Sequence, residues 1–363
     1  MKKIFSLLIL LTAFSFIAVS CGDNENADNH IYDQQIKLIS LISDKYNVVL
    51  NDDVTAQELV TFMVTNNSGV NLTVNSEIFV NEIAIETNVF TPTELGSFEV
   101  YAKYTDEESG KQFLSDKKIV NVIEDTSNLY FRHKVLIEDF TGTWCGWCTR
   151  IIYAIEQVQA QTQNAIAVGI HNDDPFDFPG RMPLEDYLQV EGAYPFATIN
   201  RKTMWKHPQH HFVNQPIDLI LPESPIGIKI NSSLGATSGT VDVSFSFKED
   251  IQGDLRYVVY VVENGLIADQ TNYNTDLYNG VPVLTGFVHD HVLRGVYGNI
   301  LGNDLGQPAT AGAEVTLSGL TVNYSSGNMD KLQVIAFIIN AQGKALNVQI
   351  AHANTEKDYE FAQ

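Results

Sequence analysis

The feature that most constrains the fold is a pair of cysteines placed where a strand gives way to a helix. Cys145 and Cys148 lie in the run FTGTWCGWCTR, directly after the dense apolar run 134–140. Residues 149–162 then carry apolar side chains at helical spacing, and 165–170 form a continuous apolar run suited to a buried parallel strand. Strand, helix and strand within about forty residues predict a βαβ unit.

A cysteine at the start of a helix is suited to thiol–disulfide exchange. Unpaired N–H groups and the helix dipole favour a thiolate at Cys145, and Cys148, one turn later, can close a disulfide with it. A zinc site would need two further ligands, and there is no second CxxC, although histidines downstream could supply them. We therefore expect a dithiol or disulfide pair with no metal and no other cofactor.

The first residues of the chain direct export. MKKIFSLLILLTAFSFIAVS has a basic start and an apolar run that is short for a membrane span. Ala18 to Cys21 resembles the lipobox of bacterial lipoproteins, which implies that Cys21 carries a lipid and becomes the N-terminus. A plain secretory signal that leaves a stray cysteine is the alternative. Residues 1–20 are thus interpreted as a lipoprotein signal peptide, and 21–30 as an acidic, flexible tether.

Composition excludes nucleic acid as a partner. The chain has 363 residues and a formal net charge of −22, which repels nucleic acid and anionic lipid headgroups. Membrane attachment therefore has to come from acyl chains and not from a basic patch. Hydrophobic residues make up 44% of the chain, enough for more than one core, so we expect several domains.

Segments rich in β pattern flank the βαβ unit on both sides. Residues 31–124 alternate apolar and polar positions between turns, which predicts an immunoglobulin-like β-sandwich, as a spacer in preference to a ligand-binding module. Residues 224–353 predict a C-terminal β-sandwich by the same period, with buried strands at the apolar runs 257–262 and 334–339. Within it, His289 and His291 have the spacing of a metal pair on a strand, but polar packing or docking against the middle domain is the preferred interpretation.

The run DFTGTWCGWC resembles the strand and active-site loop of the thioredoxin superfamily, including a tryptophan, Trp144, just before the first cysteine. The resemblance implies a thioredoxin-like α/β domain over residues 130–223, in which Cys145 is the nucleophile and Cys148 the resolving thiol. Asp139 stands where thioredoxins keep a buried carboxylate, and would relay the proton of the resolving thiol. The alternative is an aspartate that caps the loop at the strand end.

The segment GAYPFATINR resembles the thioredoxin strand that begins with a cis-proline and faces the dithiol. By this resemblance, Tyr194 and Pro195 would hold an extended substrate, and Trp144 and Trp147 would frame the contact surface. Trp147 departs from the residues usual at that motif position, which leaves reduction and oxidation of partners both open. The long insert HNDDPFDFPGRMPLEDYLQVEGAY predicts a loop and a short helix that form a groove or lid, or else surface decoration.

The order of the segments resembles a family of outer-membrane lipoproteins from Bacteroidetes that is named for its twenty-eight-kilodalton member. The resemblance covers about residues 130 to 350 and includes the strings PFATINR and HDHVLR. It implies a lipid-anchored protein at the outer membrane, facing the periplasm or the cell surface.

Two functions follow from these patterns. The first is a lipid-anchored thiol–disulfide oxidoreductase that acts on envelope protein thiols and disulfides. It needs an external redox partner, because the chain has no further cysteines to recharge the pair. The alternative is a non-enzymatic surface lipoprotein that binds a protein or glycan and uses the disulfide as a structural staple. Peroxide reduction at Cys145 is disfavoured, because the chain lacks the expected threonine–arginine pocket.

Overall fold

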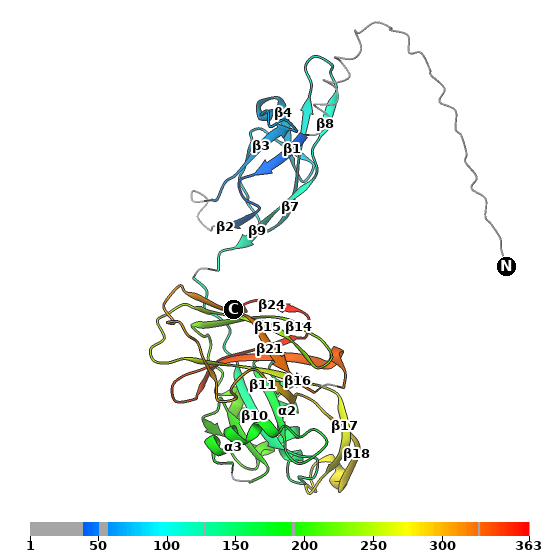
Figure 1. Cartoon of the computed structure of the whole chain (residues 1–363), viewed down its shortest axis with the longest axis vertical. Helices are drawn as coiled ribbons and strands as arrows, with labels where there is room; N and C mark the ends of the chain where they lie inside the picture. Colours follow the sequence, from blue (N-terminus) through cyan, green and yellow to red (C-terminus); the bar gives the residue numbers. More distant parts are fainter. Residues whose placement is uncertain (1–38, 51–56, 127, 191–192, 326, 363) are drawn as a thin grey trace, which may run out of the picture. The chain divides into compact units, whose positions relative to one another are not determined.

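The computed structural model describes residues 39–50, 57–126, 128–190, 193–325 and 327–362 (Figure 1). They divide into two units, Met1–Ser127 and Asn128–Gln363. The signal peptide, Cys21 and the tether lie outside the described residues. Among the helices that are described, none is both long and apolar enough to span a membrane.

The first unit is built of short strands in two sheets. One sheet has the order β1-β3-β6 and the other the order β2-β9-β7-β4-β5, with β8 on β7. The strands are β1 (Ile39–Ser43), β2 (Asn47–Leu50), β3 (Val60–Asn66), β4 (Ser76–Val80), β5 (Ile83–Ile85), β6 (Val89–Phe90), β7 (Gly96–Thr105), β8 (Gln112–Leu114) and β9 (Lys118–Glu124). Alternate residues of β3 and β7 point into one shared core, as the sequence period predicts. An immunoglobulin-like topology stays a prediction.

The second unit combines many strands with a few helices. Its strands are β10 (Val135–Thr141), β11 (Ala165–His171), β12 (Phe196–Ile199), β13 (Thr203–Met204), β14 (Ile226–Leu234), β15 (Ser238–Phe247), β16 (Arg256–Glu263), β17 (Leu266–Thr271), β18 (Val283–His289), β19 (Val292–Val296), β20 (Asn303–Asp304), β21 (Glu314–Asn323), β22 (Leu332–Ile339), β23 (Ala345–His352) and β24 (Glu356–Lys357). Its α-helices are α2 (Thr149–Gln159), α3 (Met182–Leu188) and α4 (Asn214–Ile217).

The predicted βαβ unit is present in β10, α2 and β11. The two strands pair in parallel along their whole length, from Val135 opposite Ala165 to Thr141 opposite His171. Helix α2 packs its apolar stripe, which includes Ile151, into a core that it shares with these strands. Strand β12 adds on the other side of β10 in antiparallel register. Every residue of β10 is therefore buried, as its apolar sequence predicts.

One sheet runs through both of the segments that were expected to be separate domains. Its order is β13-β12-β10-β11-β19-β16-β22-β23, with β20 beside β16. Strand β19, from the segment 224–353, pairs in parallel with β11, from the segment 130–223, at Val292 opposite Gly169. The expectation of two separate domains is corrected in this respect, because residues 128–363 form one unit. The pairing gives β11 a neighbour where it would otherwise end the sheet.

A second layer completes the C-terminal β-sandwich. The sheet β21-β15-β14-β24 packs on the part of the large sheet that β16 and β22 form, over a core that includes Phe245 and Val334. The apolar runs at β16 and β22, expected to be buried strands, are buried on both faces, because a second core that includes Tyr260 and Phe337 lies on the other side. Each core thus covers one face of these strands.

A buried ion pair joins the βαβ unit to the sandwich. Glu138 on β10 accepts from Nε and Nη2 of Arg201, at 3.1 and 3.0 Å, and from the hydroxyl of Tyr260 on β16, at 2.9 Å. Arg201 also donates to the carbonyl of Ile300 at 2.8 Å, and its guanidinium lies 4.7 Å from the ring centre of Phe337. Both charged side chains are almost fully buried. Their polar atoms are therefore stabilised by each other and not by water.

We expect Arg201→Met to lower the free energy of unfolding of the second unit by about 3–5 kcal/mol, because it leaves the Glu138 carboxylate buried and unpaired. The double variant Glu138→Leu/Arg201→Met should lose clearly less. Urea unfolding followed by tryptophan fluorescence checks this, since all three tryptophans, Trp144, Trp147 and Trp205, belong to the second unit. If the single and double variants lost equal free energies of unfolding, the result would contradict a stabilising ion pair between Glu138 and Arg201.

Candidate functional site

The predicted disulfide is present at the start of α2. Cys145 and Cys148 are joined with an S–S distance of 2.06 Å, and Cys148 is the N-cap residue of the helix. The loop before the helix is closed by its own backbone, since the N–H of Cys145 donates to the carbonyl of Gly142 at 2.9 Å. The disulfide therefore sits on a short, tightly turned loop between β10 and α2.

A hairpin from the C-terminal half of the chain covers this loop. We call residues 266–289 the cover hairpin; it consists of β17, β18 and their connection, and is inserted between β16 and β19. The N–H of Thr271 donates to the carbonyl of Thr143 at 2.9 Å, and the N–H of Tyr273 donates to the carbonyl of Gly146 at 2.8 Å. The hairpin thus hydrogen-bonds along the cysteine loop much as an added strand would.

Side chains of the cover hairpin also pack against the cysteine loop. The ring of Tyr273 lies directly over Gly146, where a Cβ atom would come within 2.4 Å of it. Gln270 donates from Nε2 to the carbonyl of Cys145 at 3.1 Å. As a result Cys145 is only 3% exposed and Cys148 is fully buried. In this structure both cysteines therefore present little surface to a partner thiol.

The carboxylate of Asp139 lies inside the protein, on β10 opposite Gly169 of β11. The side chain is almost fully buried, and its Oδ1 atom forms no hydrogen bond with any residue that the structure describes. Burial raises the pKa of Asp139 well above its ordinary value. The position is interior to the strand, not at the loop, so the alternative of a loop-capping aspartate is wrong.

A small polar chamber of about 80 Å³ adjoins Asp139. Thr141 Oγ1, His289 Nε2 and His291 Nδ1 also line it, and each is a buried polar atom without a hydrogen-bond partner among the described residues. Burial, followed by the charge of His171, lowers the pKa of His289 to about 4, so its imidazole is neutral at pH 7. The chamber is large enough for a few waters, which would pair with these atoms.

The histidine motif flagged in the sequence therefore faces the βαβ unit. His291 shares a hydrogen bond of 3.1 Å with Gln159 of α2, and the ring of His289 lies 5.4 Å from the ring of His171 on β11. Within the described part of the chain, no group of three or more histidine, cysteine, aspartate or glutamate side chains is placed to hold a metal ion.

An open groove lies beside the covered disulfide. It has a volume of about 660 Å³ and is lined by Trp147, Arg150, Tyr194, Pro195, His207, Pro208, His210, His211 and residues 273–277. Trp147 is 48% exposed and its ring meets the ring of Tyr273 edge to face, at 5.9 Å. Trp144 lies next to the groove, with its ring 5.5 Å from that of Tyr194. The groove thus brings together three of the four predicted contact residues and places the fourth at its border.

The backbone around Pro195 has the form that the resemblance implies. The Tyr194–Pro195 peptide bond is cis, and β12 begins at the next residue. The N–H and C=O groups of Tyr194 form no hydrogen bond with any described residue. They are therefore available to a ligand that lies in the groove.

The long insert after β11 supports the cysteine loop. Asp174 accepts from the N–H of Thr143 at 2.8 Å and from Nδ1 of His171 at 2.6 Å, which lowers its pKa against the effect of burial. Helix α3 is the expected short helix, and its Glu185 accepts a hydrogen bond from the hydroxyl of Tyr194. The insert therefore positions both the loop and one wall of the groove. Sequence reasoning missed Asp174, Gln270 and Tyr273, because only tertiary contacts connect them with the cysteines.

We expect Tyr273→Gly to speed reduction of the disulfide by dithiothreitol by roughly tenfold, because the ring contributes about 1–1.5 kcal/mol to keeping the hairpin closed. Ile267→Ala, on the exposed side of the same hairpin, is the matched control and should leave the rate unchanged. The rate is measured by quenched labelling of free thiols. Equal rates in all three proteins would mean that the hairpin does not limit access.

We expect the second unit to lose stability as the pH falls from 6.5 to 4. His289 has its pKa lowered to about 4 in the folded protein, so below 6.5 the unfolded chain binds a proton that the folded chain does not. The loss should be about 2 kcal/mol for this residue. Urea unfolding of the wild type and of His289→Gln at pH 7 and pH 4.5 measures it. Parallel pH curves for the two proteins would contradict the assignment.

Comparisons with known proteins point to the cell envelope. Residues 181–357 match the family model described as Outer membrane protein Omp28. The match includes Tyr194, Pro195 and the cover hairpin but not the cysteines. No curated protein matches the chain.

Among solved structures, HBP35 of Porphyromonas gingivalis is 17% identical, with a TM-score of 0.47 over 62% of this chain and 76% of that one. A putative membrane anchored protein from Corynebacterium diphtheriae is 9% identical, with a TM-score of 0.21 over 89% of this chain and 58% of that one. Domains 4–9 of the surface layer protein SbsC are 9% identical, with a TM-score of 0.19 over 88% and 50%. The family match supports an outer-membrane or envelope location for the chain.

Proposed function

We propose that the chain is an Omp28-type lipoprotein, anchored through Cys21 to the outer membrane, whose groove binds an extended segment of another envelope protein. In this function the Cys145–Cys148 disulfide is structural. One observation carries the proposal: Cys145 and Cys148 are buried on a loop against which the cover hairpin packs, while the aromatic groove beside them is open. The groove, and not the disulfide, is therefore the surface that is accessible to a partner protein.

The groove has the properties of a peptide site. Its volume of about 660 Å³ is in the range of ligand sites, and exposed rings of Trp147 and Tyr273 offer large rigid contact area. The unpaired backbone groups of Tyr194 can add hydrogen bonds to the backbone of an extended chain. A protein segment has such backbone groups at regular spacing, whereas a glycan does not. This favours a protein partner.

The disulfide then has a positioning role. It closes the turn that carries Trp147 and leads from Trp144 into α2, so the two exposed indole rings are held in one geometry. Holding contact residues in place before binding reduces the ordering cost of association. A disulfide that closes so short a loop is expected to contribute about 2 kcal/mol to stability in the chain-entropy description.

A second function, thiol–disulfide exchange on a thioredoxin-like fold, is supported by the disulfide at the N-terminus of α2 and by the buried Asp139. In the reduced protein, the Cys145 thiolate would attack a substrate disulfide and release one substrate thiolate. The Cys148 thiolate, with its proton taken by Asp139, would then attack the mixed disulfide, release the second thiolate and re-form the Cys145–Cys148 bond. An external dithiol reductant would have to regenerate the pair, and the cover hairpin would first have to move.

The binding function is tested by selecting phage-displayed random dodecapeptides on the soluble chain that starts at Gly22. Selection on the wild type should enrich peptides. Trp147→Ala should weaken the binding of these peptides tenfold or more, because the indole is an exposed anchor of the groove. Ile267→Ala, an exposed apolar residue outside the groove, should leave affinity unchanged. Failure to enrich any peptide that depends on Trp147 would contradict the proposal.

The two functions are separated by the reduction potential of the disulfide. A structural pair should have a potential below roughly −300 mV, whereas a value between about −270 and −120 mV would favour the oxidoreductase. The measurement is an equilibrium titration with a dithiol buffer, with Cys145→Ser/Cys148→Ser as the control that reports no change. For the structural role, that double variant should lose about 2 kcal/mol of stability and still bind the selected peptides, more weakly.

A further inference from the structure

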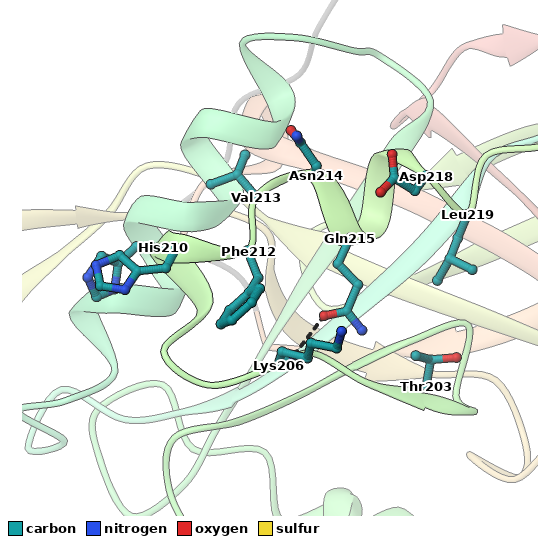
Figure 2. Close-up of a pocket in the computed structure, with 10 residues that line it drawn as sticks. Thr203, Lys206, His210, Phe212, Val213, Asn214, Gln215, Asp218 and Leu219 are labelled. Atoms are coloured by element: carbon teal, nitrogen blue, oxygen red, sulfur yellow. Dashed lines mark hydrogen bonds between the residues drawn. The ribbon is translucent and has the colours of Figure 1, made fainter.

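A second hollow adjoins the groove at His210 and His211. This hollow has a volume of about 520 Å³ and is lined by Thr203, Lys206, Asn214, Gln215, Asp218, Leu219 and residues 210–213. His210 and His211 line both hollows, so the two are adjacent across this pair of rings. Figure 2 shows the second hollow, with His210 at one side and Leu219 at the other. A ligand that lies along the groove would reach the second hollow next.

The combined surface is rich in basic side chains, which is unusual for a chain with a net charge of −22. It contains Arg150, Lys206, His207, His210 and His211 against two carboxylates, Asp218 and Asp276. The Arg150 guanidinium has one hydrogen bond among the described residues, from Nε to Gln209 at 3.0 Å, and no carboxylate partner there. The Lys206 ammonium likewise has no carboxylate within salt-bridge distance in the described part, and lies 5.8 Å from the ring centre of Phe212. Both cations are therefore open to a ligand.

The loop that carries these residues is held in a fixed shape. Buried Trp205 donates from Nε1 to the carbonyl of Phe212 at 2.9 Å. Gln215 accepts from the N–H of Lys206 at 2.8 Å, the dashed line in Figure 2, and donates to the carbonyl of Met204 at 3.0 Å. These bonds close the loop on itself, so its basic side chains are positioned before a ligand arrives.

Two histidines of the groove, His207 and His210, are held towards their neutral forms in this structure. Burial, followed by the charges of His211 and Arg150, lowers the pKa of His210, and Asp276 opposes this. Burial and the charge of Arg150 lower the pKa of His207. His210 Nδ1 is a buried atom that hydrogen-bonds to no described residue. An anionic group placed here would pair with these rings and favour their protonated forms.

We infer that the groove and the second hollow together bind an acidic protein segment, with its carboxylates between Arg150, Lys206 and the histidines. The inference rests on the proposed function and adds the chemistry of the partner. Binding should tighten as the pH falls, because each histidine that gains a proton adds a positive charge to a surface where two cations face two carboxylates at neutral pH. It should also weaken with salt, since the cations are partly exposed.

The test starts from the selected dodecapeptides. We expect them to be enriched in aspartate and glutamate, and a peptide with its acids replaced by the matching amides should bind at least tenfold more weakly. Lys206→Glu should weaken binding of the acidic peptide at least fivefold and leave binding of the amide peptide unchanged. Lys202→Glu is the matched control, because it makes the same charge change on an exposed lysine that lines neither hollow. Binding is measured by calorimetry at pH 7.5 and 5.5.

The outcomes separate the inference from the function on which it rests. Tighter binding at pH 5.5 by threefold or more, lost in His210→Gln, would support the histidine role. Selected peptides that depend on Trp147 but show no preference for acids would overturn the inference and leave the binding function intact. An alginate oligomer that binds more tightly than the acidic peptide, with the same loss in Lys206→Glu, would also overturn it, because the partner would then be a polysaccharide.

Discussion

The parallel pairing of β11 with β19 is the interaction on which the rest of the second unit depends. It joins the βαβ unit to the sandwich strands in one sheet, and the Glu138–Arg201–Tyr260 cluster fixes the same junction from the side. Because β19 ends up beside β11, the hairpin inserted between β16 and β19 emerges next to the cysteine loop. The cover over the disulfide is therefore a consequence of how the large sheet is completed.

The cover hairpin packs over the cysteine loop but leaves the two tryptophans of that loop exposed. Tyr273 and Gln270 pack on the backbone of the cysteine loop, and both cysteines are buried, which opposes exchange with partner thiols. The indole rings that flank them remain open and meet the groove. A motif that by itself predicts redox chemistry is thus largely covered, while the indole rings beside it are exposed. The cover comes from a hairpin that lies more than one hundred residues further along the chain than the cysteines.

The histidines of the second unit show how environment sets the role of one residue type. His289 and His291 line a polar chamber together with Asp139, where burial lowers the pKa of both imidazoles and raises the pKa of the carboxyl group. His207 and His210 lie on the open groove near Arg150, where an anionic ligand would shift them towards the charged form. Desolvation without a counter-charge keeps an imidazole neutral, whereas a hollow open to anions allows it to titrate.

The sequence by itself determined the local structure: the disulfide, the βαβ unit around it, the buried strands at β16 and β22, and the short helix in the long insert. These features can be predicted from the sequence because apolar periodicity and the spacing of the two cysteines involve residues that lie close together along the chain. Only the tertiary structure decided that one sheet joins the two expected domains, that Asp139 lies inside a strand beside a polar chamber, and that Tyr273 closes over Gly146. Those outcomes depend on contacts between segments more than one hundred residues apart, such as Gln270 with Cys145. No periodicity along the chain encodes such contacts, because they arise only when the sheet is assembled.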